Sequence, residues 1–467
     1  MAFVFYDTET SGTEASFDQI LQFAAIRTDP DLNELERFEI RSRLLPHVVP
    51  APGAMRVTGV TVAQLTDPAL PSHYKMLCTI RDKLDAWSPA IFTGYNSIDY
   101  DEHLLRHAFY KTLHPPYLTN FNGNGRSDVL RMVQATSLFA PDALVLPQDG
   151  AKTVLKLDRV APANGFNHED AHDALGDVEA TIFLCRLIME RAPEVWSSFM
   201  RFSQKAAVVD YISEERIFCL AEYFYGRPYC WLVTFMAANP DNSSEVYLYD
   251  LQVNPDDLCS LSDTDLATRL GKSPKPVRRM RCNASPILMP VESAPSNLAC
   301  LELGSDELDR RAELIRSEDA LRERLVAAFR STRQDKEPSP YVEMQLYDGF
   351  FSNGDRALMD AFHKASWDKR FAIVEQFEDS RLKTLGKQLI HIERPDLLTE
   401  ADRAEHDRAH IRKLLGSDGD VPWLTLPKAI QQIDDILAAC EEAELALLRE
   451  HREYLVSWLD RIAALEN

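Results

Sequence analysis

Two carboxylates stand side by side near the start of the chain, in the stretch FYDTETSGT at residues 5–13. Asp7 and Glu9 follow an apolar run that predicts a buried strand, and a Ser-Gly turn comes directly after them. Because side chains alternate along a strand, positions 7 and 9 leave it on one face. Like charges this close repel unless a cation lies between them, so the pair indicates a metal site. The alternative is a solvated strand end with two surface acids.

A second acidic group occurs in GYNSIDYDEHLLRHAF, residues 94–109, where a strand gives way to a helix. Asp99, Asp101 and Glu102 cluster at the expected helix start, behind the cap-type residue Asn96. Acids are also favoured there as partners of the helix dipole, so each of them alone fits that role.

Two histidines of the same helix, His103 and His107, have the four-residue spacing of metal ligands. No glutamate follows His103, so the HExxH pattern of zinc proteases is absent. We therefore interpret both as histidines on the helix surface.

A third stretch, NHEDAHDALGDVEATIFLCRLIM at residues 167–189, leads from an acidic, histidine-rich loop into a long amphipathic helix. His172 and Asp177 are five residues apart, which places them about 140° apart on a continuous helix. If His172 lies at the frayed helix start, both side chains can reach one site. In the alternative, Asp170 or Asp173 caps the helix and His172 is exposed to solvent.

The composition is that of a globular chain with an acidic balance. It has 467 residues, a hydrophobic fraction of 45% and a net charge of −22. That charge disfavours unaided binding of nucleic acid, so contact with a polyanion requires basic patches or metal ions. The eight cysteines form no CxxC pair, which indicates thiols in a reducing compartment rather than a disulfide framework or zinc site. Neither a signal peptide nor a membrane span is evident, so we expect a cytoplasmic protein.

The predicted elements divide the chain into three parts. In the first part we expect strands at 2–8, 20–28, 36–45 and 90–95 and helices at 61–67, 73–86, 100–113, 127–138 and 172–191. Such an alternation favours an α/β domain with a mixed sheet. The second part is β-rich, with strands in 230–238, 245–253 and 276–288 and a charged helix at 303–330. The third part is helical and ends in a predicted hairpin at 427–465.

Four acids and a histidine form a set spread over these segments: Asp7, Glu9, Asp101, Asp177 and His172. In this set the chain resembles the DEDDh exonuclease superfamily of 3′→5′ exonucleases. Six stretches of the chain are similar to the exodeoxyribonuclease I family and occur in the same order. Two are those quoted above at residues 5–13 and 94–109, and the others are LQFAAIRTD, PAPGAMRVTGVT, AHDALGDVEATI and QLYDGFFSNGDRALM. The last of them lies far outside the nuclease part, which separates this family from shorter relatives.

The resemblance implies a fold of three domains. These are a ribonuclease-H-like nuclease domain with a mixed sheet at 1–195, an SH3-like β-domain with helical additions at 196–343 and an all-α C-terminal domain at 344–467. It also implies processive 3′→5′ hydrolysis of single-stranded DNA to 5′-mononucleotides, in DNA repair and recombination in a bacterial cytoplasm. The implied partner is the C-terminal tail of single-strand DNA-binding protein. A single chain could encircle a strand, so we expect a monomer.

The family motifs also assign roles to the five residues. Asp7, Glu9, Asp101 and Asp177 become metal ligands, with Glu9 also touching the substrate, and His172 becomes the general base. Four acids suit two Mg²⁺ ions, with Mn²⁺ as a substitute, because magnesium prefers carboxylate oxygens. Two such ions about 3.5–4 Å apart stabilise both the attacking and the leaving oxygen in phosphodiester hydrolysis. A histidine with a pKa of about 6.5 can be neutral at working pH and take a proton from water.

Cations and aromatic residues predict a path for the DNA strand. Lys156 stands where the family pattern has a substrate-binding arginine, which keeps the charge but loses the bidentate fork. KSPKPVRRMR at 272–281 contains Arg278, Arg279 and no acid, although a solvated loop and strand edge would have the same composition.

In the nuclease part, Arg106 and Arg126 flank an aromatic stretch. Tyr117 and Phe121 can stack on bases there, whereas Phe109 is expected to be helix core. We interpret NGNGR at 122–126 as a flexible loop. Weaker candidates for the same path are Tyr225, Arg227, Tyr347, Phe350 and Arg356.

Three rival functions remain open from the sequence. An RNA-trimming exonuclease would have the same metal site, because a 2′-hydroxyl is sensed elsewhere. A scaffold that binds without cutting is disfavoured, since a dead site need not keep all four acids and the histidine. A metal hydrolase for another substrate would leave the basic segment 272–281 and the aromatic residues of the loop unexplained.

Overall fold

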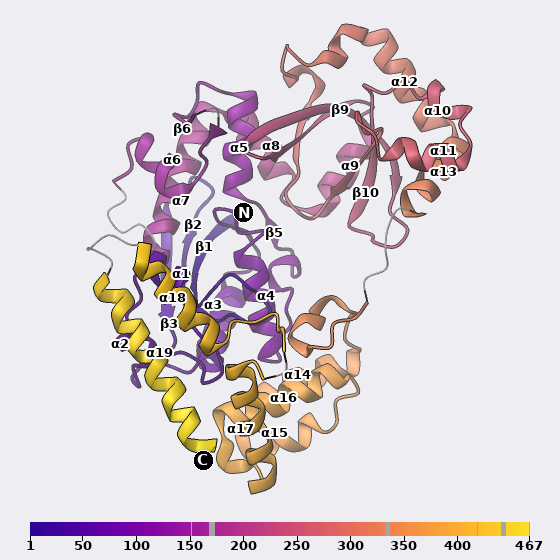
Figure 1. The fold of residues 1–467 in the computed structure, drawn as a ribbon. Helices are drawn as coiled ribbons and strands as arrows, with labels where there is room; N and C mark the ends of the chain where they lie inside the picture. Colours follow the sequence, from indigo (N-terminus) through magenta and orange to yellow (C-terminus); the bar gives the residue numbers. More distant parts are fainter. Residues whose placement is uncertain (151, 168–172, 332–336, 418, 440–444, 467) are drawn as a thin grey trace.

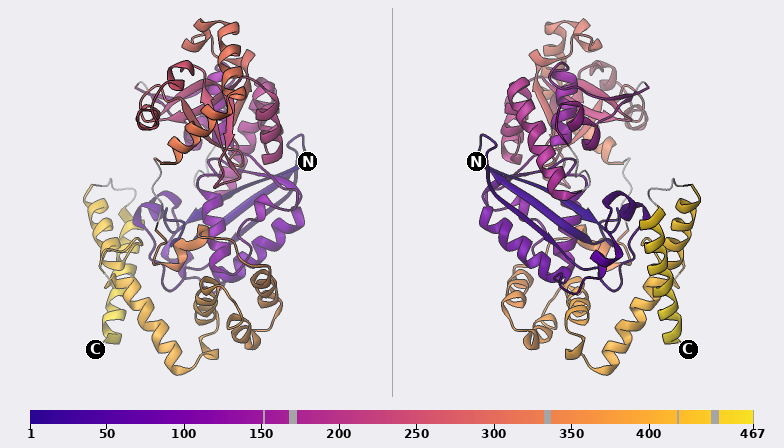
Figure 2. Two further views of the ribbon diagram at one scale, coloured as in Figure 1. Left: turned by 90° about the vertical axis from the view of Figure 1, so that its right-hand side faces the viewer. Right: turned by 90° about the vertical axis from the view of Figure 1, so that its left-hand side faces the viewer.

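The computed structural model describes the chain except for residues 151, 168–172, 332–336, 418, 440–444 and 467. An α/β part lies in the middle, with a β-rich part on one side and the C-terminal helices mainly on the other (Figures 1 and 2). This is the expected combination of a nuclease-type mixed sheet, a small β-domain and a helical C-terminal region.

The central sheet has the strand order β3-β2-β1-β4-β5. Its members are β1 (Ala2–Thr10), β2 (Ile20–Thr28), β3 (Glu34–Arg41), β4 (Ala90–Thr93) and β5 (Gly125–Arg126). Strand β1 is antiparallel to β2 and parallel to β4, so the sheet is mixed as predicted. It is also covered on both faces, because Phe3 and Phe5 join one buried cluster while Val4 and Tyr6 join another.

Helices on these two faces place the later parts of the site. The predicted ones are found as α2 (Val62–Thr66), α3 (His73–Trp87), α4 (Asp101–Lys111), α5 (Val129–Phe139) and α7 (Ala174–Arg191). Elements that the sequence did not predict are α1 (Pro52–Thr58), β5, the pair β6 (Gln148–Asp149) and β7 (Lys152–Thr153), α6 (Leu157–Ala163), α8 (Pro193–Arg201) and α9 (Lys205–Glu214). Val178 of α7 packs in the cluster that holds Phe3 and Phe5, so α7 covers the odd-numbered face of β1.

The β-rich part is an antiparallel sheet with the order β11-β10-β9-β8-β12. Its strands are β8 (Phe218–Phe224), β9 (Arg227–Ala238), β10 (Glu245–Asp250), β11 (Val277–Arg281) and β12 (Ile287–Pro290). The single strand expected at 276–288 is therefore two strands on opposite edges, and β8 was not predicted. The helix expected at 303–330 is also two helices, α12 (Ser305–Ser317) and α13 (Asp319–Ser331), because the chain leaves helical geometry at Glu318. Two short helices, α10 (Asp256–Cys259) and α11 (Asp263–Leu270), lie between β10 and β11.

The C-terminal part is helical as predicted and packs against the nuclease part. It contains α14 (Asn353–Lys364), α15 (Trp367–Val374), α16 (Ser380–Glu393), α17 (Glu400–Leu415), α18 (Leu426–Ala439) and α19 (Leu445–Glu466). One buried cluster joins Tyr110 and Leu113 to Phe362, and another joins Val49 to Leu426. Within the described residues, no helix combines the length and the apolar character needed to cross a membrane.

Candidate active site

Three carboxylates converge where β1 meets the first turn of α7. Ligand oxygens of Asp7, Glu9 and Asp177 all lie within 4.8 Å of one another. The reason is the two-residue period of β1, since positions 7 and 9 share the face that Phe3 and Phe5 turn towards α7. Asp177 stands in the first turn of that helix. The prediction that the first and third acidic stretches meet is therefore confirmed.

The fourth predicted acid, Asp101, lies next to this cluster but is held by a neighbouring residue. It opens α4 and is buried, and its Oδ1 accepts hydrogen bonds from the Thr8 backbone N–H at 3.1 Å and the Thr8 hydroxyl at 2.6 Å. The Asp101 carboxylate contributes to raising the pKa of both Asp7 and Glu9, so it is electrostatically part of the site. Its role as a metal ligand stays a prediction.

Ionisation of Asp7, Glu9 and Asp101 is unfavourable when no cation is bound beside them. Burial is the largest cause that raises the pKa of Glu9 to about 8, and the Asp177 carboxylate is the next. Burial and the neighbouring acids also raise the pKa of Asp7 well above its usual value, while burial raises that of Asp101 to about 7. A crowded, half-buried set of oxygen ligands fits a hard divalent cation, which would compensate the repulsion. The residues present therefore fit the metal that the sequence implied.

The predicted general base, His172, lies outside the described residues. The next residue, Asp173, caps α7 by accepting a hydrogen bond from the Leu175 backbone N–H at 3.2 Å. Its carboxylate is also held by Arg41 at 2.7 Å and by Gln22 at 3.1 Å. One of the two caps considered from the sequence is thus found, and the role of His172 remains a prediction.

A groove leads away from the acids between the α/β part and the β-domain. Asp177 and the exposed Lys156 line a cavity of about 610 Å³, together with Tyr223 and Gly226 at the tip of the β8–β9 hairpin. An adjoining cavity of about 340 Å³ shares Asn96, Leu130, Gln134 and Tyr223 with the first. Its lining adds Arg131, Arg279 and Arg281. Asp177 therefore connects the acid cluster to a groove whose lining carries four cations together with the acids Asp99, Asp158 and Glu222.

Family models match the chain in three blocks. A model described as Exonuclease matches residues 4–184, one described as Exonuclease I SH3-like domain matches 206–331, and one described as Exonuclease I C-terminal domain matches 340–458. The chain is also 31% identical to exodeoxyribonuclease I of Haemophilus influenzae over 405 residues, which cover 82% of this chain and 84% of that protein. The chain belongs to the exodeoxyribonuclease I family. It is accordingly an exonuclease.

Other members of the exodeoxyribonuclease I family agree in sequence and fold. Exodeoxyribonuclease I of Escherichia coli is 27% identical over 82% of this chain and 83% of its own. A solved exonuclease I from Methylocaldum szegediense has a TM-score of 0.83 at 27% identity, covering 98% of this chain and 99% of that one. The E. coli exonuclease I solved in complex with a dT13 oligonucleotide shares the fold, with a TM-score of 0.83 and 24% identity over the same shares.

The predicted cations of the β-domain differ in what they can reach. Arg279 is exposed and lines the groove, with Glu245 3.5 Å away. Arg278 is not among the groove residues, because its guanidinium lies 3.6 Å from the centre of the Trp231 ring and pairs with the buried Asp250 at 2.9 Å. Part of the basic segment 272–281 forms a sheet edge, as in the alternative interpretation from the sequence, because β11 is an outer strand.

The two predicted arginines of the nuclease part are paired inside the protein. Glu102, which is 2% exposed, binds Arg106 at 2.7 Å and forms a close ion pair with Arg126. Arg126 also donates to the backbone carbonyl of Asn283 and so connects the nuclease part to the β-domain. The expectation of a flexible loop at 122–126 is corrected here, because Gly125–Arg126 pair with β4 as strand β5 and are buried. Because both guanidinium groups are largely buried and paired with Glu102, these arginines stabilise the structure around the expected DNA path. Arg126 in particular has too little exposed surface to contact a phosphate itself.

Replacing Glu102 with glutamine should destabilise the protein strongly. It would leave two largely buried guanidinium groups without their counter-charge, which typically costs about 3–5 kcal/mol. Chemical unfolding monitored by tryptophan fluorescence measures the loss. The exposed ion pair between Arg37 and Glu34 provides the control, and Glu34→Gln should cost less than about 1 kcal/mol. Equal stabilities of the two variants would contradict the structural role of Glu102.

The predicted aromatic residues gather at the junction with the C-terminal part. Tyr117, Phe121 and Phe350 line a cavity of about 250 Å³, and Phe121 and Phe350 are 58% and 79% exposed. Tyr347 is half exposed, and its hydroxyl lies 2.8 Å from Nδ1 of His103. Phe109 is core, as expected.

His107 differs from the surface position that its spacing suggested. It is buried, with Nδ1 2.9 Å from the His103 carbonyl and Nε2 3.4 Å from the Ser16 hydroxyl. Neither His103 nor His107 belongs to a metal-ligand group among the described residues.

Proposed function

We propose that the chain degrades single-stranded DNA from its 3′ end, processively, to 5′-mononucleotides, and that it serves DNA repair and recombination. The observation that carries the proposal is the cluster of Asp7, Glu9 and Asp177, of which Asp177 lines a groove that also contains four cations. Carboxylates that hold metal ions beside such a groove suit hydrolysis of a polyanion. The names of the curated relatives and the solved complex of a family member with dT13 support DNA as the substrate.

We propose two Mg²⁺ ions as the cofactor, with Mn²⁺ able to replace them. Asp7, Glu9 and Asp177 would hold the ions, with Asp101 as a fourth ligand. When bound, such ions stabilise the attacking and the leaving oxygens of the phosphodiester. In this scheme His172 accepts the proton of the attacking water. Lys156 contacts a phosphate near the scissile bond from the same cavity as Asp177.

We further propose that single-stranded DNA follows the groove past Arg131, Arg279 and Arg281 and that its bases also stack on the aromatic residues near the C-terminal helices. Single-strand sites combine cations for the backbone with aromatic rings for the bases. The exposed Phe350 and Phe121 meet the second requirement, and the half-buried Tyr117 lies between them and Arg106, whose guanidinium carbon is 5.3 Å from its ring centre.

Phe350→Ala should weaken binding of single-stranded DNA by roughly 5- to 150-fold, because loss of one stacked base typically costs about 1–3 kcal/mol. Fluorescence anisotropy with a labelled oligonucleotide, in EDTA to prevent cleavage, measures the affinity. Phe371→Ala is the matched control, since Phe371 is an exposed phenylalanine of α15 that does not line this cavity. If both variants bind like the parent chain, stacking at Phe350 is excluded.

Processivity, a monomeric state and docking of the acidic tail of single-strand DNA-binding protein complete the proposal. Cations and aromatic residues contributed by three parts of the chain would make release of the strand slow. An assay in which unlabelled DNA traps released enzyme tests this point, and one cut per binding event would contradict it.

We also propose three domains. The limits expected after residues 195 and 343 fall inside α8 and the short helix Val342–Tyr347, so we place these limits in the adjacent loops.

The deciding experiment incubates the purified chain with 5′-labelled single-stranded DNA, in magnesium and in excess EDTA. Matched RNA, duplex DNA and the Asp7→Ala variant are run alongside. The expected result is a magnesium-dependent ladder that shortens from the 3′ end, with DNA only, and is absent in the variant. Degradation of RNA would support an RNA-trimming enzyme instead. Binding without cleavage in magnesium or manganese would leave a scaffold.

A further inference from the structure

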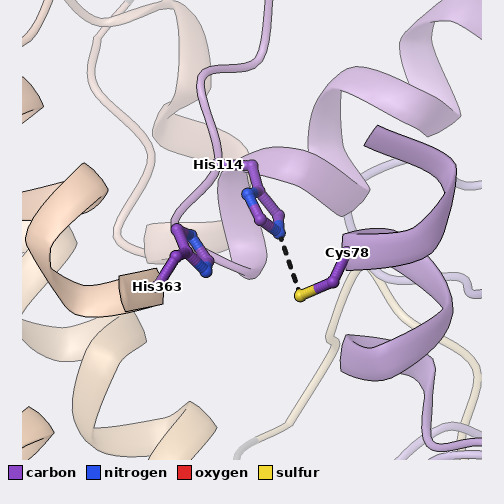
Figure 3. A group of neighbouring side chains, drawn as sticks. All are labelled: Cys78, His114 and His363. Atoms are coloured by element: carbon purple, nitrogen blue, oxygen red, sulfur yellow. Dashed lines mark hydrogen bonds between the residues drawn. The ribbon is translucent and has the colours of Figure 1, made fainter. Parts of the chain in front are cut away.

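A second cluster of metal-ligand side chains lies where the C-terminal helices meet the nuclease part. Cys78 comes from α3, His114 from the segment after α4 and His363 from α14, and Figure 3 shows them converging. One ligand atom of each lies within 4.8 Å of the others. Because the three residues are far apart in the sequence, no spacing motif could have indicated them.

The distances are close to those of a tetrahedral metal site. Zinc binds thiolate at about 2.3 Å and imidazole nitrogen at about 2.0–2.1 Å, so a sulfur and a nitrogen ligand lie roughly 3.5 Å apart. Cys78 Sγ is 3.4 Å from Nε2 of His114. The His114 and His363 rings are stacked, with centres 3.7 Å apart. Because the lone pairs of an imidazole lie in the plane of its ring, zinc binding requires one of the two rings to turn out of this stack.

The surroundings of His363 fix which of its nitrogens is available to a metal. Nε2 of His363 lies 2.9 Å from the backbone carbonyl of Leu113, and because a carbonyl only accepts, this nitrogen carries the proton. Nδ1 therefore has a free lone pair, which now accepts from the Tyr74 hydroxyl at 3.0 Å. A ring held through one nitrogen in this way is typical of metal-ligating histidines.

We propose that Cys78, His114 and His363 bind one Zn²⁺ ion that fastens α14 to α3 and to the end of α4. One sulfur and two nitrogen ligands favour zinc over magnesium, whereas the all-oxygen active site has the opposite preference. On binding, the Cys78 thiol releases its proton to solvent and coordinates as thiolate. The fourth position falls to water or to the Tyr74 hydroxyl.

Two cations, Arg81 and Arg370, lie near the cluster and oppose binding of a further cation, and Arg81 gives a specific test. Arg81 lies 3.2 Å from Nδ1 of His114, and a guanidinium only donates, so the His114 proton sits on Nε2 and points at Cys78. Zinc at Nε2 requires the proton to move to Nδ1 and Arg81 to turn away, towards Asp85, with which it already pairs at 3.3 Å. Arg81→Gln should therefore raise the affinity for zinc by roughly tenfold.

The test uses the full chain carrying Asp7→Asn, which weakens metal binding at the carboxylates. The protein is stripped with a chelator and titrated with Co²⁺, whose bonds to thiolate give an intense near-ultraviolet charge-transfer band that carboxylates do not give. We expect this band to saturate at one Co²⁺ per chain and Zn²⁺ to displace it. Zinc should also raise the unfolding temperature. The absence of a thiolate band would overturn the proposal.

Matched variants locate the site. Cys78→Ser and His363→Gln should each abolish the band and the zinc-dependent rise in unfolding temperature. Two ligand variants are used so that a folding defect in one of them does not decide the result. Buried His114 is left in place for the same reason. Cys259→Ser, which removes an exposed cysteine of α10, should change neither readout. A band that survives Cys78→Ser would overturn the proposal.

Discussion

Replacing Asp7 with asparagine is expected to lower the exonuclease rate by a factor of about 10³ or more, because metal stabilisation of the transition state is worth several kcal/mol. Asp7 is one of the three acids whose ligand oxygens lie within 4.8 Å of one another, and asparagine keeps its shape while removing the charge. Initial rates on single-stranded DNA at saturating magnesium measure the effect. Asp31→Asn, at an exposed acid in the turn before β3, is the control and should cleave normally.

The same substitution is expected to stabilise the metal-free protein at alkaline pH. In EDTA the folded chain holds protons on its crowded acids more tightly than the unfolded chain, since the pKa of Glu9 is raised from 4.5 to about 8 and that of Asp7 is also raised. Stability should therefore fall as the pH rises from about 4.5 to about 8, because in this range the unfolded chain has already lost these protons whereas the folded chain still binds them. Removing one charge relieves the repulsion.

Denaturant unfolding in EDTA at pH 5 and pH 8 tests this expectation. One pKa unit corresponds to about 1.4 kcal/mol, so the gain for Asp7→Asn at pH 8 should exceed about 1 kcal/mol and shrink at pH 5. Magnesium should stabilise the parent chain more than the variant. A variant that cleaves DNA, or one that is less stable than the parent in EDTA at pH 8, would contradict the assignment of Asp7 to the metal site.

The three clustered acids could be predicted because local rules fix the directions of their side chains. The period of two in β1 places Asp7 and Glu9 on one face, and that face meets α7 with Asp177 in its first turn. The pairing of strand and helix is not a local property, and only the family resemblance joined the segments before the structure did. The surroundings of Asp101 could not be predicted in this way, because the hydrogen bonds that it accepts from Thr8 depend on the contact between β1 and α4.

Exposure of charged residues was harder to predict, because it depends on partners from other elements. Arg126 is buried through β5 and Glu102, and Arg278 is partly covered by Trp231 and paired with Asp250. One usable signal was missed, namely the four-residue spacing of Glu102 and Arg106, which predicts a helical ion pair and is found at 2.7 Å. A second was the turn-forming Asn-Ala-Ser-Pro at 283–286, which separates β11 from β12.

His172→Ala is expected to lower the rate by about 10²- to 10⁴-fold, which is the usual contribution of a general base. The reason is the family motif, in which a histidine at this position takes the proton of the attacking water. In the parent chain the rate should rise with pH through about 6.5, the ordinary pKa of histidine, and the variant should lose this rise. Steady-state rates between pH 5.5 and 8.5 measure both, and His406→Ala, on α17, serves as the control.

The carboxylates titrate in a similar range when no metal is bound, so magnesium must be varied to assign the inflection. In the proposed scheme protons compete with magnesium for Glu9 and Asp101, so an inflection caused by them should move to lower pH as magnesium increases. An inflection caused by His172 should stay in place, and added imidazole should restore part of the activity of His172→Ala. If the parent profile is flat between about pH 6 and 8 at saturating magnesium, the proton of the attacking water goes to another acceptor and His172 is not the base.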